Sequence, residues 1–420
     1  MTTSTNWGGN LTYRAREVVR PTTFDELSAA ITAHERIAVI GTRHAFGAIG
    51  DADVLLDLAS LDLSTPITDD IDGLTIVSAR STYAEVCPRL DAAGCALHNL
   101  ASLPHISIGV AISTATHGSG RHARGLAASV GLIEVVDGEG RRTVLRDGDP
   151  DFDGTVVGLG SLGAITRVGL LTEPAYEVAQ TVYEGLSWDT LAESFDEVMS
   201  LATSVSVFTR WGSGPMSVWC KQRTDAVVDA TTHPRPSDLG LVAATTAHHP
   251  IPGASPASCT PQLGRPGPWW TRLTHFRADS TPSNGEEIQS EFFVDLAHAP
   301  AAVDALRMLG DELDDVLLVS EIRTVAADTF WMSPCRGVDS VGFHFTWRMD
   351  PERTAAAVEQ VGRALGHLAP RPHWGKVFPD SWTARRAPYD VDAFLALKGR
   401  LDPNDRFTTP WFDRVVRAGT

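Results

Sequence analysis

The chain has 420 residues, of which 43% are hydrophobic and 21% are charged. That is enough material for two globular domains of roughly 150–200 residues each. The formal net charge of −17 argues against nonspecific binding to nucleic acid or to an anionic membrane, and no apolar run reaches the length of about 18 residues that a transmembrane helix needs.

The beginning of the chain, MTTSTNWGGN, has neither the basic start nor the apolar centre of a secretory signal. Five scattered cysteines form no CxxC pair, so neither a disulfide framework nor a zinc site is predicted. A cytoplasmic protein with reduced cysteines is the simplest interpretation. The acidic turn at 147–154 lacks the glutamate that closes an EF-hand loop, so we expect no metal site there.

The first third of the chain alternates short apolar runs with helical patterns, which predicts an α+β domain. Thr23 and Glu26 have the spacing of a capping box that opens a helix through residue 35. Strands are predicted at 36–40, 53–58 and 73–79, and a helix at 82–94 that ends at Gly94.

The turn at residues 41–51, GTRHAFGAIGD, follows the first of these strands. Its glycines would let backbone N–H groups approach a phosphate closely. His44 within this turn is open to three interpretations: a structural side chain, a proton carrier or an attachment point.

The stretch 101–125 is dominated by small residues and also permits close contact with an extended, charged ligand. It matches neither the Rossmann GxGxxG pattern nor a P-loop. An ordinary loop has the same composition, so this stretch alone is weak evidence of a site.

A glycine-rich stretch and a strand at 158–177 mark the predicted end of the first domain. The Pro/Gly-rich stretch 248–270 is too broken for a long helix or strand and is interpreted as a surface excursion, since Trp269 and Trp270 need a place to bury. Further on, strands are predicted at 287–296, 316–325 and 340–349, with a helix at 299–313.

The last two of these strands have polar side chains at alternate positions. Glu321 and Arg323 share one face of the first strand, and His344, Thr346 and Arg348 share one face of the second. The opposite face of the second strand is apolar from Val341 to Trp347 and is expected to be core. The polar faces either line a pocket that binds several hydroxyls or form a solvated sheet surface with a Glu–Arg pair.

The stretch 371–378, RPHWGKVF, places Lys376 beside Trp374 and Gly375. A lysine in such surroundings can be partly desolvated, with a lowered pKa or a fixed point charge. Taken alone, the stretch favours an ordinary exposed lysine.

Several stretches together are similar to a known family. NWGGNLTY, NLASLPHIS, THGSG, EPAYE, GPWW, EIRTVAAD, HFTW and RPHWGKVF resemble, in order and nearly end to end, the alditol and xylitol oxidases among the vanillyl-alcohol-oxidase-type FAD flavoproteins. Aldonolactone oxidases are more distant members. The resemblance implies an α+β, two-domain flavoprotein: a PCMH-type FAD-binding domain at 1–178, a sheet-plus-helices substrate domain at 179–372, and a segment at 373–420 that completes the FAD domain.

The resemblance also implies roles for individual residues. His44 matches the histidine that is joined covalently to the flavin in this family. Arg323, Lys376 and Glu321 match catalytic positions, and substrate-binding positions are Ser102, Glu321, Arg323, His344, Thr346 and Lys376. The implied FAD contacts are Gly41, Thr42, Arg43, His44, Ala45, Phe46, Ser102, Ser107, Val110, Ala111, Ile112, Ser113, His117, Gly118, Ile165, His373 and Lys376.

This sequence departs from the family pattern near the expected substrate. Arg121 stands where the resemblance implies a small apolar residue, so it either makes the pocket cationic, for a substrate with an anionic group, or turns to solvent or pairs with a local acid. Val110 and Ala115 stand where glycine is common, and Arg43 precedes His44 where a small residue is usual.

The activity that the resemblance implies is hydride transfer from a primary alcohol of a polyol-like substrate to FAD, with O2 reduced to H2O2. Two alternatives stay open: an aldonolactone oxidase or dehydrogenase, and a redox-inactive flavin-binding protein. The expected partners are the small-molecule substrate and O2, without nucleic acid or membrane, and the chain is expected to be a monomer.

Overall fold

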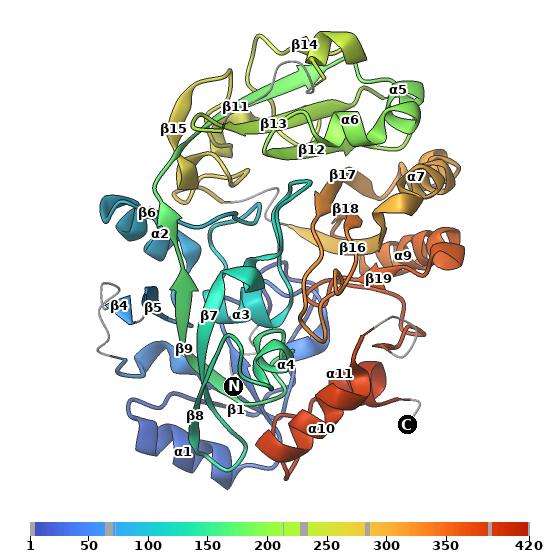
Figure 1. Cartoon of the computed structure of the whole chain (residues 1–420). Coiled ribbons are helices and arrows are strands. Elements are labelled where there is room, and N and C mark those ends of the chain that lie inside the picture. Colours follow the sequence, from blue (N-terminus) through green and yellow to red (C-terminus); the bar gives the residue numbers. More distant parts are fainter. Residues whose placement is uncertain are drawn as a thin grey trace.

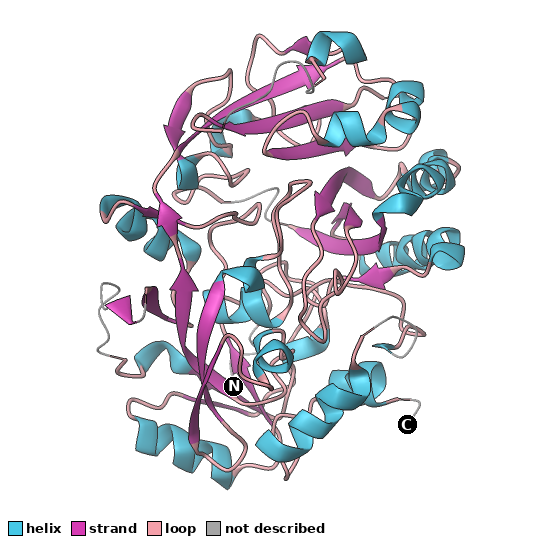
Figure 2. Ribbon diagram, viewed as in Figure 1, coloured by secondary structure: helices cyan, strands magenta, loops and turns pink. Residues whose placement is uncertain are grey.

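The computed structural model describes residues 5–63, 70–71, 73–212, 214–226, 234–281, 286–384 and 389–418. Its elements form two groups, which occupy the lower and upper parts of Figure 1, and Figure 2 shows sheets flanked by helices in both. No helix of the described residues combines the length and the apolar character needed to cross a membrane.

In the part of the chain that the structure describes, the lower group contains three small sheets. A parallel sheet has the order β1 (Glu17–Val19), β3 (Val54–Asp57) and β2 (Ile37–Ile40). An antiparallel sheet has the order β4 (Asp70–Ile71), β5 (Leu74–Ser78), β9 (Ala164–Leu171), β7 (Val130–Val136) and β8 (Arg142–Arg146), and β6 (Cys95–Ala96) pairs with β10 (Glu173–Pro174). The helices of this group are α1 (Phe24–Ala33), α2 (Tyr83–Ala92), α3 (Ile108–Ser113) and α4 (Phe152–Val156).

The C-terminal segment returns to this lower group. In Figure 1, α10 (Val391–Leu401) and α11 (Pro410–Phe412), which continues as a π-helix over Asp413–Arg417, lie beside α4. Phe394 and Trp411 from this segment share one buried cluster with Val77 and Ile133 of the sheet. The two ends of the chain therefore form one core.

The upper group is a nine-stranded sheet among the described residues. Its strands are β14 (Val242–Ala243), β11 (Glu177–Glu184), β13 (Ser217–Arg223), β12 (Ser204–Thr209), β17 (Leu317–Val325), β18 (Ser340–Arg348), β16 (Glu287–Asp295) and β19 (Arg371–Pro372) in spatial order, with β15 (Pro266–Pro268) paired to β11. Its helices are α5 (Trp188–Glu193), α6 (Phe195–Met199), α7 (Ala299–Arg307), α8 (Gly310–Leu313) and α9 (Pro351–Leu365).

One face of this sheet is apolar and packs against its helices. Phe343, Phe345 and Trp347 of β18 belong to a buried cluster with Val303 of α7 and Val361 of α9. The predicted core face of β18 is therefore confirmed. Because side chains alternate along a strand, the polar residues of β18 lie on the opposite face, toward the lower group.

Two local predictions differ from the structure. Thr23 caps α1 by accepting a hydrogen bond from Glu26 N (3.2 Å), but the Glu26 carboxylate accepts from Thr22 N (2.7 Å), so the reciprocal bond of a capping box is not made to Thr23. The helix predicted over 299–313 is divided into α7 and α8. At the break, Gly310 lies so close to the Trp211 carbonyl oxygen that an added Cβ would be 2.7 Å from it.

The helix predicted at 82–94 is confirmed as α2, with a complete capping box between Thr82 and Glu85 and with Gly94 at φ +77° beyond its end. The Pro/Gly-rich excursion also buries an indole as expected: Trp269 is fully buried and packs near Tyr176.

Candidate active site

Three neighbouring strands direct polar side chains at one cavity. Glu291 on β16, His344 on β18 and Glu321 on β17 are direct cross-strand partners, so they form a row across the sheet. Thr346 and Arg323 lie on the same face because they are two residues away along their strands. All five side chains are buried.

The cavity joins these strands to the lower group. Its lining includes thirteen of the residues singled out from the sequence: His44, Ala45, Phe46, Ser102, Val110, Ala111, His117, Glu321, Arg323, His344, Thr346, His373 and Lys376. The pocket alternative for the polar strand faces is therefore the one the structure shows. Lys376, which follows β19, lines the cavity and has a side chain that is only 12% exposed.

A second cavity meets the first at His44. It is lined by backbone-rich and small residues that include Gly41, Arg43, Ser107, Ser113 and Ile165. His44, Ala45, Val110 and Thr114 line both cavities. The two cavities thus adjoin, with the polar cluster in the first and small residues in the second.

Four predicted site residues do not line either cavity: Thr42, Ile112, Gly118 and Arg121. Thr42 instead contacts a residue that lines the second cavity: its hydroxyl accepts a hydrogen bond from Ser107 N (3.2 Å). Gly118 lies against Leu100 and Asn99, where a Cβ would overlap the Leu100 carbonyl oxygen. Ile112 is fully buried in the core.

Arg121 corrects one expectation from the sequence. Its guanidinium pairs with Asp339 (Nη1–Oδ2 2.8 Å) and with Asp196 (Nε–Oδ1 3.4 Å). Two carboxylates therefore neutralise Arg121 outside the cavity, so pairing with a local acid is the alternative that holds. The structure offers no support for a substrate with an anionic group on account of Arg121.

Glu291 is the centre of the polar cluster. Its Oε1 accepts from Arg323 Nη2 (2.7 Å), and its Oε2 accepts from Lys376 Nζ (2.7 Å). His117 Nε2 lies 3.3 Å from Oε1. Because Glu291 is fully buried, it fixes the positions of both cations from behind the cavity wall.

The pKa values in the cluster follow from burial and from these pairs. Burial alone would raise the pKa of Glu291, but Arg323 and Lys376 outweigh it and hold the pKa well below its usual range. Burial lowers the pKa of Lys376 to about 8, against the opposing charge of Glu291. Of the two interpretations of this lysine, the partly desolvated one agrees with its 12% exposed side chain. His344 is held neutral, since burial and then Lys376 lower its pKa well below the usual value.

Gly342 makes room for the Arg323–Glu291 pair. It lies on β18 between Arg323 on β17 and Phe293 on β16, as the cross-strand partner of both. A Cβ at this position would be 3.2 Å from Glu291 Oε1. The absence of a side chain on the middle strand therefore allows the ion pair to reach across it.

The spacing of His117, Glu291 and His373 would also suit a metal ion, since their ligand atoms lie within 4.8 Å of one another. Glu291, however, is already bonded to two cationic side chains, which would repel a cation. We therefore assign the carboxylate to the ion cluster.

Several buried polar atoms have no protein partner and face the joined cavities. Both ring nitrogens of His44, the Ser107 hydroxyl and Arg323 Nε are buried without a hydrogen bond. Buried polar groups are normally satisfied, so these atoms point to a ligand. Burial, followed by the charge of His105, lowers the pKa of His44 to about 4, and Trp7 stacks on its ring at 5.2 Å.

The glycine turn fits a cofactor that contacts the backbone. A Cβ at Gly41 would overlap the Ser107 hydroxyl and lie 2.7 Å from Val110 Cγ2. Arg43 and Ala115 have φ values of +60° and +54°, a left-handed conformation in which glycine carries less strain. Together with the unpartnered atoms, the small-residue cavity is suited to FAD.

Sequence reasoning missed four side chains of the site. Glu291 and Gln289 are at alternate positions of β16, and the period-two pattern applied to the next strands would have found them. His275 and Lys221 lie on elements far apart in sequence and are linked to Glu321 only through the fold.

Comparisons with known proteins agree with this geometry. A family model described as FAD binding domain matches residues 15–146, and one described as D-arabinono-1,4-lactone oxidase matches residues 283–415. The chain is 42% identical over 414 residues to an alditol oxidase from a Streptomyces species, with 97% of each chain covered. An L-gulono-1,4-lactone dehydrogenase from Mycobacterium tuberculosis is 26% identical, with 98% of each chain covered.

Among solved structures, cholesterol oxidase from B. sterolicum has a TM-score of 0.77 over 98% of this chain and 96% of that one, at 13% identity, which shows the fold alone. These findings confirm the two-domain α+β fold with a PCMH-type FAD-binding domain and the use of FAD. The chain therefore belongs to the alditol oxidase family of FAD-dependent oxidoreductases.

Proposed function

We propose that the chain oxidises a primary alcohol of a polyol-like molecule, with its FAD attached covalently through His44 and with dioxygen reduced to hydrogen peroxide. The observation that carries the proposal is the lining of one cavity. Six side chains suited to hydroxyl groups converge there: Ser102, Glu321, Arg323, His344, Thr346 and Lys376. The cavity begins at His44, and the 42% identical relative is named for alditols.

The joined cavities supply the residues that would hold the cofactor. Gly41, Ser107 and Ser113 line the second, small-residue cavity, and His44 lies where this cavity meets the polar one. Bound FAD supplies the chemistry of accepting a hydride from carbon and passing two electrons to dioxygen.

Arg323 and Lys376 would act on the reacting hydroxyl. Both are cationic groups at the cavity, held in place by Glu291. Fixed cations in a water-poor site stabilise a developing alkoxide, so they lower the pKa of a hydroxyl bound between them. Arg323 Nε, which has no protein partner, offers a further donor.

The remaining polar groups would bind the other hydroxyls. The Gln289 amide donates to Glu287 Oε1 (2.6 Å), so its oxygen faces His344 Nε2 (3.1 Å). His344 therefore carries its proton on Nε2, which leaves Nδ1 as an acceptor. Glu321 is an ionised acceptor, since burial raises its pKa but Arg323 and His275 outweigh this. Such a set suits an open chain with several hydroxyls.

An anaerobic panel of alditols, lactones and sugar acids tests the proposal. We expect alditols to bleach the flavin absorbance of the purified holoenzyme, and peroxide to form when air is admitted. Each hydroxyl removed from the best alditol should cost roughly 1–3 kcal/mol, because a buried polar group is left unpaired. Bleaching by lactones alone would show an aldonolactone oxidase, and a flavin that no compound bleaches would show a redox-inactive protein.

Replacement of Arg121 by valine is expected to leave the preference between neutral and anionic polyols unchanged to within about twofold, because the guanidinium is neutralised outside the cavity. Steady-state kinetics on a polyol and its phosphate ester measure this. A large gain in kcat/KM for the neutral compound would show that Arg121 does contact the substrate.

A further inference from the structure

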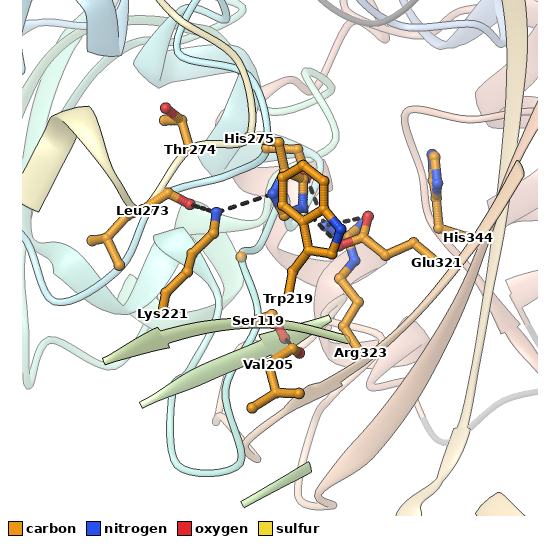
Figure 3. Close-up of polar contacts among 12 residues, drawn as sticks. Ser119, Val205, Trp219, Lys221, Leu273, Thr274, His275, Glu321, Arg323 and His344 are labelled. Carbon is orange, nitrogen blue, oxygen red and sulfur yellow. Dashed lines mark hydrogen bonds and ion pairs between the residues drawn. The ribbon is translucent and has the colours of Figure 1, made fainter. Parts of the chain in front are cut away.

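We propose that Lys221 and His275 are positioning residues that hold the Glu321 carboxylate as a hydrogen-bond acceptor for substrate hydroxyls, and so set the affinity of the cavity for polyols. The proposal rests on the function proposed above. Figure 3 shows the three side chains in a row that ends at Glu321, near Arg323 and His344, and Glu321 lines the cavity.

The chain of contacts connects three separate parts of the upper group. Lys221 is on β13 and Glu321 on β17, with β12 between these strands. His275 comes from the segment after β15 and lies between the two side chains. Lys221 Nζ is 3.0 Å from His275 Nδ1, and His275 Nε2 is 2.9 Å from Glu321 Oε1.

The order of donors along this chain is fixed by its first member. Lys221 Nζ has enough N–H groups for both of its partners, as an ammonium or, above its pKa of about 7, as an amine, and it donates to the Leu273 carbonyl and to His275 Nδ1. Nδ1 is therefore an acceptor and the imidazole proton lies on Nε2. From there it is donated to Glu321 Oε1, which commits one carboxylate oxygen, while Oε2 lies 3.6 Å from Arg323 Nη1.

Aromatic neighbours and the backbone fix the histidine itself. Phe208 and Trp219 contact the His275 ring edge to face, with centroids 5.4 and 5.5 Å away. The His275 backbone N–H also donates to the Ser102 carbonyl oxygen (3.0 Å). One residue thus positions Glu321 through its side chain and Ser102 through its main chain.

Burying an apolar residue at position 221 would cost less free energy than burying Lys221 does. Lys221 is 1% exposed, and burial lowers the pKa of its ammonium to about 7. Its hydrogen-bond partners are a carbonyl and an imidazole rather than a carboxylate. Burying a cation in this way is unfavourable, so a role in orienting His275 accounts for it better than packing does.

Steady-state kinetics of Lys221→Met distinguish a positioning role of Lys221 from a purely structural one. Without Lys221 Nζ, His275 Nδ1 loses its hydrogen-bond donor, and the ring is no longer held in place against Glu321. We expect the KM for the best polyol to rise about 10- to 100-fold, with kcat changed less than about threefold. His275→Leu should raise KM similarly, and His275→Gln should recover part of the affinity, because its amide can still donate to Glu321.

Arg272→Met is the matched control. Arg272 is a buried cation in the same segment, bonded to the Arg265 and Pro266 carbonyls, and it does not line the cavity. We expect a lower Tm and an unchanged KM. If Lys221→Met and His275→Leu behave as Arg272→Met does, the residues are merely structural and the proposal is overturned.

Imidazole ¹⁵N NMR of the holoenzyme gives a readout that needs no turnover. Wild-type His275, assigned by comparison with His275→Gln, should carry its proton on Nε2, and Lys221→Met should show a shifted Nδ1 resonance or a charged ring, because Nδ1 has lost its donor and the charge of Lys221 no longer lowers the pKa of the ring. A wild-type proton on Nδ1 would contradict the proposal. If wild-type enzyme turns over no polyol, the proposed function fails, while the NMR result still decides whether the contact chain exists.

Discussion

Replacement of Glu291 by glutamine is expected to lower kcat/KM by about two to three powers of ten, the largest effect we expect from a residue that the substrate does not touch. Glu291 is bonded to both Arg323 and Lys376 at 2.7 Å. Glutamine keeps the size of the side chain but removes its charge, so Lys376 loses its paired carboxylate and Arg323 keeps only Glu321, at 3.6 Å. Breaking a buried pair in this way costs roughly 3–5 kcal/mol, part of which will appear as lower stability.

The loss of kcat/KM in Glu291→Gln should be larger at high pH than at low pH. The wild-type Lys376 ammonium, with a pKa lowered by burial to about 8, loses its proton as the pH rises through that value, and kcat/KM should fall with it. Glu291 is the main group that opposes the effect of burial. In Glu291→Gln the pKa of Lys376 therefore falls further, the ammonium persists only at lower pH, and the defect is smallest under acidic conditions.

A pH profile of kcat/KM between about 5 and 9 measures this shift. Glu134→Gln is the matched control, since Glu134 is a buried carboxylate bonded to Arg142 (2.7 Å) and near Arg167 (3.4 Å), on β7 and away from the cavities. That variant should lose stability and keep the wild-type profile. A Glu291→Gln enzyme with an unshifted profile would show that the carboxylate does not control Lys376.

The parts of the site that could be predicted from the sequence are those with a regular alternation of polar and apolar residues. The period of two along 340–349 separated core from polar positions, and the structure has the same division on β18. Glu291 carries the same signal, with Gln289 two residues before it, but a buried carboxylate in an apolar strand becomes meaningful only when its cationic partners are known. Those partners are 32 and 85 residues away in sequence.

Other parts of the site had no local signal. His275 follows a Pro/Gly-rich stretch without periodicity, and its path past Ser102 and Glu321 is set by tertiary contacts. Arg121 stood close to residues that match the family, yet its partner Asp339 is 218 residues away and holds it outside the cavity. Residue type and spacing therefore predicted which chemistry was available, whereas the fold decided which groups take part.

The second large effect concerns His44. We expect wild-type protein, denatured in sodium dodecyl sulfate, to carry a fluorescent flavin band at 45.1 kDa, and His44→Ala to carry none. The imidazole is neutral, because burial and the nearby His105 lower its pKa to about 4 against an opposing contact with the Thr42 backbone, and neither nitrogen meets the geometry of a hydrogen bond to the protein. A neutral, unpartnered nitrogen is a competent nucleophile, and the stacked Trp7 ring restricts its orientation.

His98→Gln is the matched control for this loss. His98 is a half-buried imidazole in the same part of the fold, but its Nδ1 is bonded to the Ser129 hydroxyl (3.0 Å) and its Nε2 to the Arg124 carbonyl (3.1 Å). With both nitrogens occupied it has no lone pair to offer, so its replacement should leave the fluorescent band in place. A wild-type protein that shows no fluorescent band after this denaturation would show that His44 contacts the cofactor without a covalent bond. The unpartnered nitrogens would then mark a binding contact only.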